Sequence, residues 1–476
     1  MFSLRNIPFG RLVFRNIQIR SKSMFTVGCK IEESINTDLE KEVYKPKDHP
    51  GKVRFGGPIE IPSYIQKSIE RETDGNNKIK EYIEEGVKLD RYLFSRQVNL
   101  EQKDVFAERK KIQRQLQAEQ KTHQDNSLRA GELMSNETET KAKKELSAKI
   151  DEIYYKHNYN WKPIEFTDAT ARAYLYGRAA KEYAIILKIF SEIAKRDPEF
   201  RPQSYFDFGA GVGTGIWAAS QLWEKSIFEY FCVDKSSEMN ELSDLIIRGA
   251  KRDKRKNIFY RQFLPASEQT KYHIVLSAFS LMELENLEAR LEILNTLWKK
   301  CDGYLIVIEN GTNAGFQLIE EARTFILSQK NFDTEAYLFS PCPHEKPCPR
   351  VLADDGTPCN FSLCFHPLRI GSLKTLNDDK VRYSYVVFKK GSRSDDATAD
   401  WPRLVRPTQI RGCHTHCRLC THLGELRQIV LTKRKHSKFT YRCAKKSDTG
   451  DRLPVVFDQD AFVPPDMEIP DDEKFD

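Results

Sequence analysis

The sequence predicts an α/β fold, with a mostly parallel sheet covered by helices on both faces. Two observations predict it. From residue 204 onward, short apolar runs rich in aromatic and β-branched residues alternate with helical patterns. A glycine-rich turn joins the first of these runs to the helix that follows it. The length of 476 residues predicts more than one structural unit.

A helix is expected before the sheet. Apolar residues recur at steps of three and four between Ala173 and Ala194, which is the spacing of one helical face, and Pro198 and Pro202 follow it. The strands and helices then alternate. The expected strands are 204–209, 229–234, 257–262, 272–279, 303–310 and 381–390, and the expected helices are 214–223, 236–250, 287–301 and 314–329.

The first 28 residues predict a mitochondrial transit peptide, and therefore a protein of the mitochondrial matrix. Basic residues are interleaved with apolar ones, and no acidic residue occurs before Glu32. The alternative is a disordered basic arm that touches RNA. The basic residues are Arg5, Arg11, Arg15, Arg20 and Lys22.

Residues 29–160 predict an extended and helical N-terminal region. Residues 30–75 are rich in Pro, Gly, Lys and Glu, which favours a loosely ordered arm, and residues 77–156 are highly charged with a helical pattern. Within them, residues 126–140 lack apolar periodicity and predict a linker. No apolar run approaches the roughly 18 residues that span a membrane, so no membrane association is expected.

The glycine-rich turn predicts a cofactor site. Its spacing is G-x-G-x-G with an acid two residues upstream, which resembles the first motif of the S-adenosylmethionine methyltransferases. The G-x-G-x-x-G spacing of dinucleotide-binding domains does not fit. Asp234 ends the second strand, where an acid is expected to accept hydrogen bonds from ribose hydroxyls. The other candidate cofactor-binding residues are Asp207, Gly209, Gly211 and Gly213.

No catalytic residue is assigned, and enzymatic activity is left open. The segment 276–286 lacks the Asn/Asp-Pro-Pro-aromatic motif of many amino-methylating enzymes. Cys342 is a weak candidate nucleophile, because it also begins a cysteine-rich segment. Glu283 is a candidate general base, although capping or solvating a helix start is the more ordinary role.

Cysteines and histidines gather in two segments, 342–366 and 413–422. Soft thiolates suit zinc or an iron–sulfur cluster. The gaps after Cys342 and Cys348 are wide for zinc, and the proline after each resembles the Cys-Pro steps of iron–sulfur proteins. The second segment alone suits zinc better. Reduced, buried cysteines without a metal are the structural alternative.

The C-terminal part is basic and ends in an acidic tail. Residues 401–452 hold 13 Lys or Arg against three acids, whereas residues 454–476 hold eight acids and one Lys. Residues 427–446 predict two strands joined by a basic turn, with Phe439 and Tyr441 among the basic residues. We expect an RNA-facing surface here, with an ordinary solvated hairpin as the alternative.

Together these motifs resemble the family of methyltransferase-like protein 17, which contains mitochondrial small-ribosomal-subunit proteins and assembly factors. The resemblance is carried by RAYLYGRAAKEYAIILKIF, SYFDFGAGVGTGIWAA, CPHEKPCP with the later PCNFS, and WPRLVRP…CRLCT…YRCAKKSDTGDRLP. It implies a Rossmann-like class I methyltransferase domain with little or no activity. It also implies a [4Fe–4S] cluster held by Cys342, Cys348, Cys359 and Cys420, with zinc as the alternative.

The leading hypothesis is a mitochondrial small-subunit assembly factor that binds rRNA and ribosomal proteins, is monomeric outside the ribosome, and supports mitochondrial translation. The alternatives are an active S-adenosylmethionine-dependent rRNA methyltransferase and a zinc-dependent RNA-binding adaptor. The expected parts are a transit peptide (1–28), a helical N-terminal extension (29–160), the methyltransferase-like domain (161–395) with a Cys-rich metal-binding insertion (340–366), a small basic β-rich module that completes the metal site (396–453), and the acidic tail (454–476).

Overall fold

The structure is a computed structural model of the chain. It describes residues 29–457, apart from 54, 74, 76, 99–105, 107–108, 117–145, 154–163, 250–256, 266, 268, 330–335, 370–377, 394–395 and 397. The predicted transit peptide, the predicted linker at 126–140 and nearly all of the acidic tail lie outside these residues. Within the described part, no helix has the length and the apolar composition that crossing a membrane requires.

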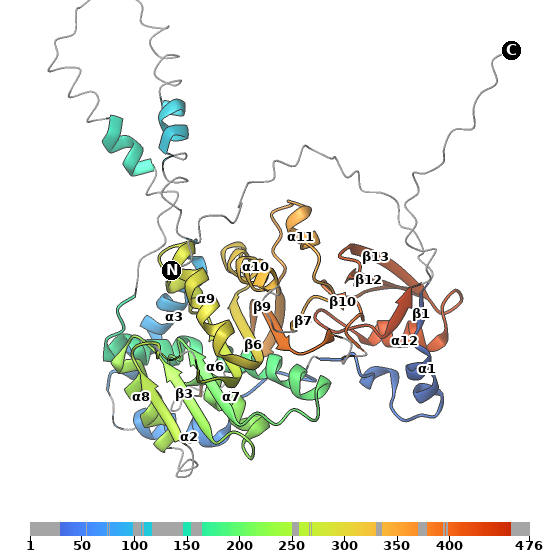
Figure 1. Ribbon diagram of the computed structural model, residues 1–476, viewed down its shortest axis with the longest axis horizontal. Helices are drawn as coiled ribbons and strands as arrows, with labels where there is room; N and C mark the ends of the chain where they lie inside the picture. Colours follow the sequence, from blue (N-terminus) through green and yellow to red (C-terminus); the bar gives the residue numbers. More distant parts are fainter. Residues whose placement is uncertain are drawn as a thin grey trace, which may run out of the picture.

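The largest sheet has the strand order β4-β3-β2-β5-β6-β9-β7 (Figure 1). The first five strands are parallel, and β9 runs antiparallel between β6 and β7. This arrangement is the sheet of the Rossmann-like methyltransferase fold, so the predicted fold class is confirmed. The strands are β2 (Ser204–Phe208), β3 (Glu229–Val233), β4 (Asn257–Arg261), β5 (Tyr272–Ala278), β6 (Cys301–Asn310), β7 (Ala336–Ser340) and β9 (Asp379–Lys390).

Helices cover both faces of this sheet, because alternate side chains of each strand feed two separate cores. In β2, Tyr205 belongs to one core and Phe206 to the other. The first core includes α6 (Asp168–Arg196), α7 (Thr214–Trp223) and α8 (Ser237–Gly249). The second includes η3 (Leu281–Glu283), α9 (Leu287–Lys300) and α10 (Asn313–Ser328).

The Cys-rich insertion interrupts one edge of the sheet. Both β7 and β8 (Phe361–Phe365) pair antiparallel with β9, β7 with its end and β8 with its start. Tyr383 pairs with Phe361 of β8 on one side and with Asn310 of β6 on the other. Residues 341–360, which include α11 (Pro349–Leu352), therefore leave the sheet between two strands that share an edge of β9.

The N-terminal extension packs on the first face of the domain. Helix α2 (Ser63–Thr73) lies against α8, and α3 (Ile79–Ser95) lies against α6. The α3–α6 contact depends on glycine, since a Cβ on Gly86 would lie 2.5 Å from the carbonyl oxygen of Ala173. Residues 109–116 and 146–153 are also helical and form a small core of their own.

The C-terminal module is a small β-rich unit, as predicted, but it is completed by the start of the described chain. Strand β1 (Cys29–Ile31) pairs antiparallel with β14 (Val455–Phe457), and Figure 1 shows β1 and α1 (Glu33–Glu40) beside α12. The remaining elements are β10 (Arg403–Leu404), β11 (Gln409–Arg411), β12 (His414–Cys420), β13 (Leu426–Thr432) and α12 (Lys438–Lys446). Strand β14 lies just beyond the expected end of the module at residue 453.

Two expectations about these segments are wrong. Residues 438–446 form a helix instead of a strand, because Ser437 caps the helix by accepting a hydrogen bond from the N–H of Thr440 (3.1 Å) and Cys443 and Ala444 are buried one turn later. The arm at 30–75 is not loose. After η2 (Pro46–Asp48), the N–H of Val53 donates to Asp451 of the module (2.9 Å), and further on the N–H of Ile59 donates to the carbonyl of Cys364 (3.0 Å).

Candidate cofactor pocket and cysteine site

The glycine loop joins β2 to α7 and turns back toward β3. The N–H groups of Gly209 and Ala210 both donate to the carbonyl of Val233, at 2.8 and 3.1 Å. Gly213, at a φ of +86°, precedes the first residue of α7. The loop therefore places the N-terminus of α7 at the carboxyl edge of the sheet, where Rossmann-like folds bind their ligands.

Gly209 and Gly211 serve different purposes in this loop, although both have positive φ. A Cβ on Gly209 would lie 2.5 Å from Cβ of Ser280, so the loop could not approach the end of β5 with a larger residue. Gly211, at a φ of +52°, has no described atom within 4 Å of the position of a Cβ. Gly211 therefore faces open space, as a residue that a ligand approaches does.

Asp234 follows β3 and lies beside the open space at Gly211. Its Oδ2 accepts a hydrogen bond from the N–H of Gly211 (2.8 Å), and its Oδ1 accepts one from the N–H of Ser236 (3.0 Å). Burial raises the pKa of Asp234, while these two backbone donors lower it. The carboxylate lies beside the glycine loop, where it can accept hydrogen bonds from ribose hydroxyls.

Asp207 lies beneath the loop. It is 2% exposed, and the hydroxyl of Tyr205 donates to its Oδ2 (2.7 Å). Burial raises the pKa of Asp207 to about 7. A Cβ on Gly215 would collide with this carboxyl group and with Tyr205. The arrangement supports the loop from below, and nothing in it directs Asp207 at a ligand.

Glu283, the candidate general base, lies after β5 and is already paired. The buried Arg96, directly after α3, forms an ion pair with the carboxylate of Glu283 and donates to the carbonyl of Met282 (3.3 Å). Arg96 is 1% exposed. Sequence reasoning missed Arg96, because 187 residues separate it from Glu283 and nothing in its local sequence signals the contact.

The structure brings the four predicted cysteines within electrostatic reach of one another. Cys342 and Cys348 lie in the loop after β7, Cys359 precedes β8, and Cys420 ends β12. Burial raises the pKa of Cys420 well above its usual value, and repulsion from the other three thiolates raises it further. Burial and then repulsion from Cys342 raise the pKa of Cys348 to about 11.

The other cysteines of the two segments lie elsewhere. Cys364 and Cys413 are exposed, and Cys417 and Cys443 belong to the apolar core of the C-terminal module. Among the described residues, no group of three or more His, Cys, Asp or Glu side chains is arranged to hold a metal ion as it stands. The chemistry of the four neighbouring thiols nevertheless suits a soft metal, whether zinc or an iron–sulfur cluster.

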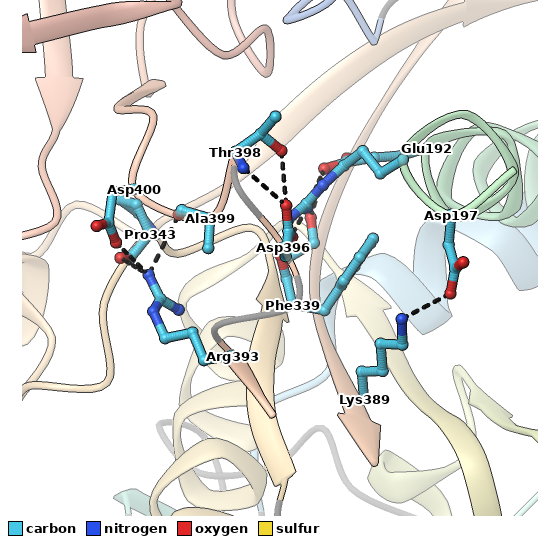
Figure 2. A network of polar contacts seen from close by, with 12 residues as sticks. Glu192, Asp197, Phe339, Pro343, Lys389, Arg393, Asp396, Thr398, Ala399 and Asp400 are labelled. Atoms are coloured by element: carbon cyan, nitrogen blue, oxygen red, sulfur yellow. Dashed lines mark hydrogen bonds and ion pairs between the residues drawn. The ribbon is translucent and has the colours of Figure 1, made fainter. Parts of the chain in front are cut away.

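We call residues 341–348, which follow β7, the Cys loop. Arginine side chains donate hydrogen bonds to its backbone carbonyls. Arg403 Nε donates to the carbonyl of Pro341 (2.9 Å), and Arg393 Nη2 donates to that of Pro343 (2.5 Å), as Figure 2 shows for Arg393. Arg323 Nη2 donates to the carbonyls of His344 (3.3 Å) and Lys346 (2.5 Å). An irregular buried loop needs such partners for its carbonyl groups.

His344 connects the Cys loop to β12. Its Nε2 lies 3.3 Å from Sγ of Cys420, and its Nδ1 lies 3.2 Å from the carbonyl oxygen of Lys346. Burial and the nearby Arg323 lower the pKa of His344 to about 4, so the ring is neutral at pH 7. The imidazole therefore fills the space between the Cys loop and the C-terminal module without adding charge.

The C-terminal module carries a basic surface on β11, β12, α12 and the turn before α12. Arg418 projects from β12, where its Nε donates to Gln428 of β13 (3.2 Å). Charge of one sign on neighbouring elements is the electrostatic signature of a nucleic-acid-binding face. We call this set the basic face, and its exposed members are Arg411, Arg418, Lys433, Arg434, Lys435, Lys438, Arg442, Lys445 and Lys446.

A cavity of about 330 Å³ lies where the N-terminal arm, α6, β8, β9 and the C-terminal module meet. Lys188, Glu192 and Tyr383 are among the residues that line it, and none of its lining residues belongs to the glycine loop. Burial lowers the pKa of Lys188 to about 8. The cavity is thus separate from the candidate cofactor pocket.

Comparison with protein families gives a match over residues 168–454, to the family described as mitochondrial small ribosomal subunit Rsm22. The human protein named ribosome assembly protein METTL17, mitochondrial, is 36% identical over 322 residues, which are 66% of this chain and 69% of that protein. The mitochondrial ribosome assembly protein RSM22 of Saccharomyces cerevisiae is 22% identical over 414 residues, covering 57% of this chain and 65% of that protein. The Rsm22-cox11 tandem protein 2 of Schizosaccharomyces pombe is 26% identical, and the match covers only 44% of its length.

Solved structures of methyltransferases also resemble part of the chain. A putative RNA methyltransferase from Pyrococcus horikoshii is 14% identical, with a TM-score of 0.26, over 44% of this chain and 82% of that one. The plantazolicin methyltransferase BpumL is 13% identical, with a TM-score of 0.29, over 46% of this chain and 88% of that one. The fold assignment rests on the strand order of the sheet.

Proposed function

This chain belongs to the mitochondrial small ribosomal subunit Rsm22 family, and from that membership we propose that it is an assembly factor of the mitochondrial small ribosomal subunit. It would act in the mitochondrial matrix, as a monomer outside the ribosome, by binding small-subunit rRNA and ribosomal proteins. This role would support mitochondrial translation. The human and Saccharomyces cerevisiae relatives are both named as mitochondrial ribosome assembly proteins.

One observation supports the proposal: the four thiols lie within electrostatic reach of one another, between the Rossmann-like domain and the C-terminal module. Three come from residues 342–359 and the fourth is Cys420, and all lie within the stretch that the family model matches. We propose that these thiols hold a [4Fe–4S] cluster. Such a group would supply a structural cross-link between segments far apart in the sequence, where closing a loop stabilises most.

The basic face supports the RNA-binding part of the proposal. It lies on the module that the cluster would attach to the domain, so loss of the cluster would also misplace this surface. Lys and Arg side chains that neutralise phosphates release counterions, which supplies most of the affinity of non-specific RNA binding. The candidate partner is therefore an RNA backbone presented by an immature small subunit.

The glycine loop and Asp234 support a retained pocket for S-adenosylmethionine. The open space at Gly211 beside a fixed carboxylate fits the sugar of the cofactor. The acceptor side of the pocket fits catalysis less well. Glu283, after β5, is paired with the buried Arg96, so it does not offer a free base to a substrate. We therefore propose a methyltransferase-like domain that binds its cofactor without transferring the methyl group.

Metal analysis of the full chain, purified without oxygen, tests the proposal. We expect iron and acid-labile sulfide in the unchanged protein and in Cys364→Ser, whose thiol is exposed and outside the group of four. Cys348→Ser should lose the iron and yield less folded protein. Zinc in place of iron would support an RNA-binding zinc adaptor. A protein that contained neither iron nor zinc would contradict the proposed cluster.

A second experiment separates an assembly factor from an rRNA methyltransferase. Cells that carry Gly211→Ala or Asp234→Ala would be examined for small-subunit assembly and for methylated rRNA bases. Loss of one methyl mark while subunits still assemble would indicate an active enzyme. Loss of subunits, or no change in any mark, would favour the assembly role.

A further inference from the structure

Arg323 differs from the other arginines that hold the Cys loop, because it donates to two carbonyls of the loop, whereas Arg393 and Arg403 donate to one each. Its Nη2 donates to the carbonyls of His344 (3.3 Å) and Lys346 (2.5 Å), and its buried Nε has no hydrogen-bond partner among the described residues. Arg323 lies on α10 and is 3% exposed. It forms an ion pair with Glu320 at 3.4 Å. A buried positive charge therefore lies at the backbone of the Cys loop, within electrostatic reach of Cys342 and Cys420.

The charge of Arg323 reaches more than one thiol. Burial raises the pKa of Cys342 and of Cys420, while Arg323 lowers both. Arg403 also lowers the pKa of Cys342, but its guanidinium is already engaged by Glu192 at 2.6 Å. The ion pair of Arg323 with Glu320 (3.4 Å) is thus longer than that of Arg403 with Glu192 (2.6 Å).

We propose that Arg323 is the positioning residue of the cysteine site: it fixes the Cys loop through two carbonyls and offsets the negative charge of the thiolates when a cluster is bound. This inference rests on the cluster of the proposed function. Four thiolates around an iron–sulfur core leave net negative charge, and burying such charge is costly unless a cation accompanies it. Net charge and hydrogen bonds to sulfur also set the reduction potential of such clusters.

Arg393 provides the matched comparison. It holds the Cys loop through the carbonyl of Pro343 and is anchored by Asp400 at 2.8 Å, both visible in Figure 2. The acceptors of its Nη2 are oxygen atoms, those of these two residues and of Ala399. Arg393→Gln therefore removes a hydrogen bond that holds the Cys loop. Arg323→Gln removes two such hydrogen bonds and also a positive charge near the sulfurs.

The experiment uses the full chain, purified without oxygen, as the unchanged protein and as Arg323→Lys, Arg323→Gln and Arg393→Gln. Two quantities are measured: the rate at which a chelator removes the metal, and the midpoint potential from a redox titration followed by electron paramagnetic resonance. We expect Arg323→Gln to lose metal about 10–100-fold faster, the range found for groups that support metal ligands. Its potential should fall, since a nearby cation favours the more negative, reduced cluster.

The two partial variants separate the two roles. Arg323→Lys keeps the charge but loses the fork that holds two carbonyls, so metal should leave faster while the potential stays close to that of the unchanged protein. Arg393→Gln should likewise keep the potential. If Arg323→Gln fails to fold, as judged by circular dichroism, the potential and release rate of Arg323→Lys still test the assignment.

Equal potentials and equal release rates in Arg323→Gln and Arg393→Gln would overturn the inference. Arg323 would then act, like Arg393, only by holding carbonyl groups of the Cys loop. That result would not contradict the proposed cluster. An unchanged protein without iron and sulfide would instead defeat the proposed cluster, and with it the role of Arg323 beside it. A zinc-loaded protein that releases zinc equally fast with and without Arg323 would overturn the inference as well.

Discussion

Arg403 of the C-terminal module and Glu192 of α6 form a buried ion pair, with Arg403 Nη2 2.6 Å from Glu192 Oε1. The two side chains are 2% and 3% exposed. Glu192 also accepts hydrogen bonds from Ser340, at the end of β7 (3.1 Å), and from Tyr385 of β9 (3.3 Å). Because Arg403 holds the carbonyl of Pro341 as well, the docking of the module and the conformation of the Cys loop depend on the same side chain.

Replacing Glu192 with Gln should therefore destabilise the protein strongly. Removing one partner of a buried ion pair leaves the other charge uncompensated, at a cost of about 3–5 kcal/mol. Unfolding in urea, followed by circular dichroism, measures the change. Glu425→Gln is the matched control, because Glu425 pairs with Arg427 on the surface at 2.7 Å, where such pairs contribute about 0–1 kcal/mol. Equal losses in the two variants would contradict the prediction.

The same pair predicts a dependence of stability on pH. Burial alone would raise the pKa of Glu192, but Arg403 and Arg196 lower it far below its usual range. A carboxylate with a lowered pKa stabilises the fold at pH values above its unfolded pKa of about 4.3, and this stability is lost as the pH falls. We expect the difference between the unchanged protein and Glu192→Gln to shrink as the pH falls below about 4.

The contribution of Glu309 to stability should change with pH in the opposite direction. It is fully buried at the end of β6, where its Oε1 accepts from the N–H of Leu281 (3.0 Å) and its Oε2 has no hydrogen-bond partner among the described residues. Burial raises its pKa to about 8. Stability from a raised carboxyl pKa is complete below about pH 4.3 and is lost as the pH rises toward 8.

Glu309→Gln should therefore gain stability relative to the unchanged protein as the pH rises from 5 to 8, by an amount on the order of a few kcal/mol. Urea unfolding at several pH values measures this difference. The control is Glu288→Gln, at an exposed position in the first turn of α9. A difference that stays constant with pH would show that Glu309 is ionised in the folded protein.

Asp234 should determine the affinity for S-adenosylmethionine. Asp234→Ala removes the acceptor of the Gly211 and Ser236 N–H groups and the candidate partner of the ribose. Hydrogen bonds to a charged group contribute about 1.5–3 kcal/mol, so affinity should fall roughly 10–100-fold. Isothermal titration calorimetry measures it, with Asp244→Asn on α8 as the control. Unchanged binding by Asp234→Ala would exclude this pocket as the cofactor site.

The basic face should determine how RNA binding depends on salt. Each phosphate contact contributes about 0.7–0.9 to the slope of log K against log salt. Replacing Lys433, Arg434 and Lys435 with Gln should therefore reduce the slope by about 2 to 3 for a small-subunit rRNA fragment. Fluorescence anisotropy at several salt concentrations measures the slope. Lys80→Gln with Lys299→Gln, exposed positions outside the module, should leave it nearly unchanged.

The sheet could be predicted from sequence because its buried strands are continuous apolar runs separated by amphipathic helices. Strands β7 and β8 were missed, since the irregular Cys-rich insertion lies between them in place of an amphipathic helix. The second of the two strands expected within 427–446 was wrong, because alternating basic and aromatic residues are also typical of a surface strand. The Ser437 cap and the burial of Cys443 favour a helix there.

The candidate site was predictable only where its residues carry a local pattern. The glycine loop is such a pattern, and the four cysteines were assigned through the family resemblance. Arg96, Arg323, Arg393 and Arg403 carry no local signal, because each acts on a segment distant in sequence; the Arg403–Glu192 contact spans 211 residues. Long-range contacts of this kind depend on the tertiary fold, which a local pattern does not specify.

The pairing of β1 with β14 also has a consequence for the order of events during biosynthesis. Residues 29–31 are synthesised before the other described residues and residues 455–457 after them, so β1 can pair only once β14 has been made. The Rossmann-like domain contains its own strands and can fold first. The unit that presents Cys420 and the basic face is completed only after β14 has been made, so the proposed metal binding and RNA contact would follow the folding of the Rossmann-like domain.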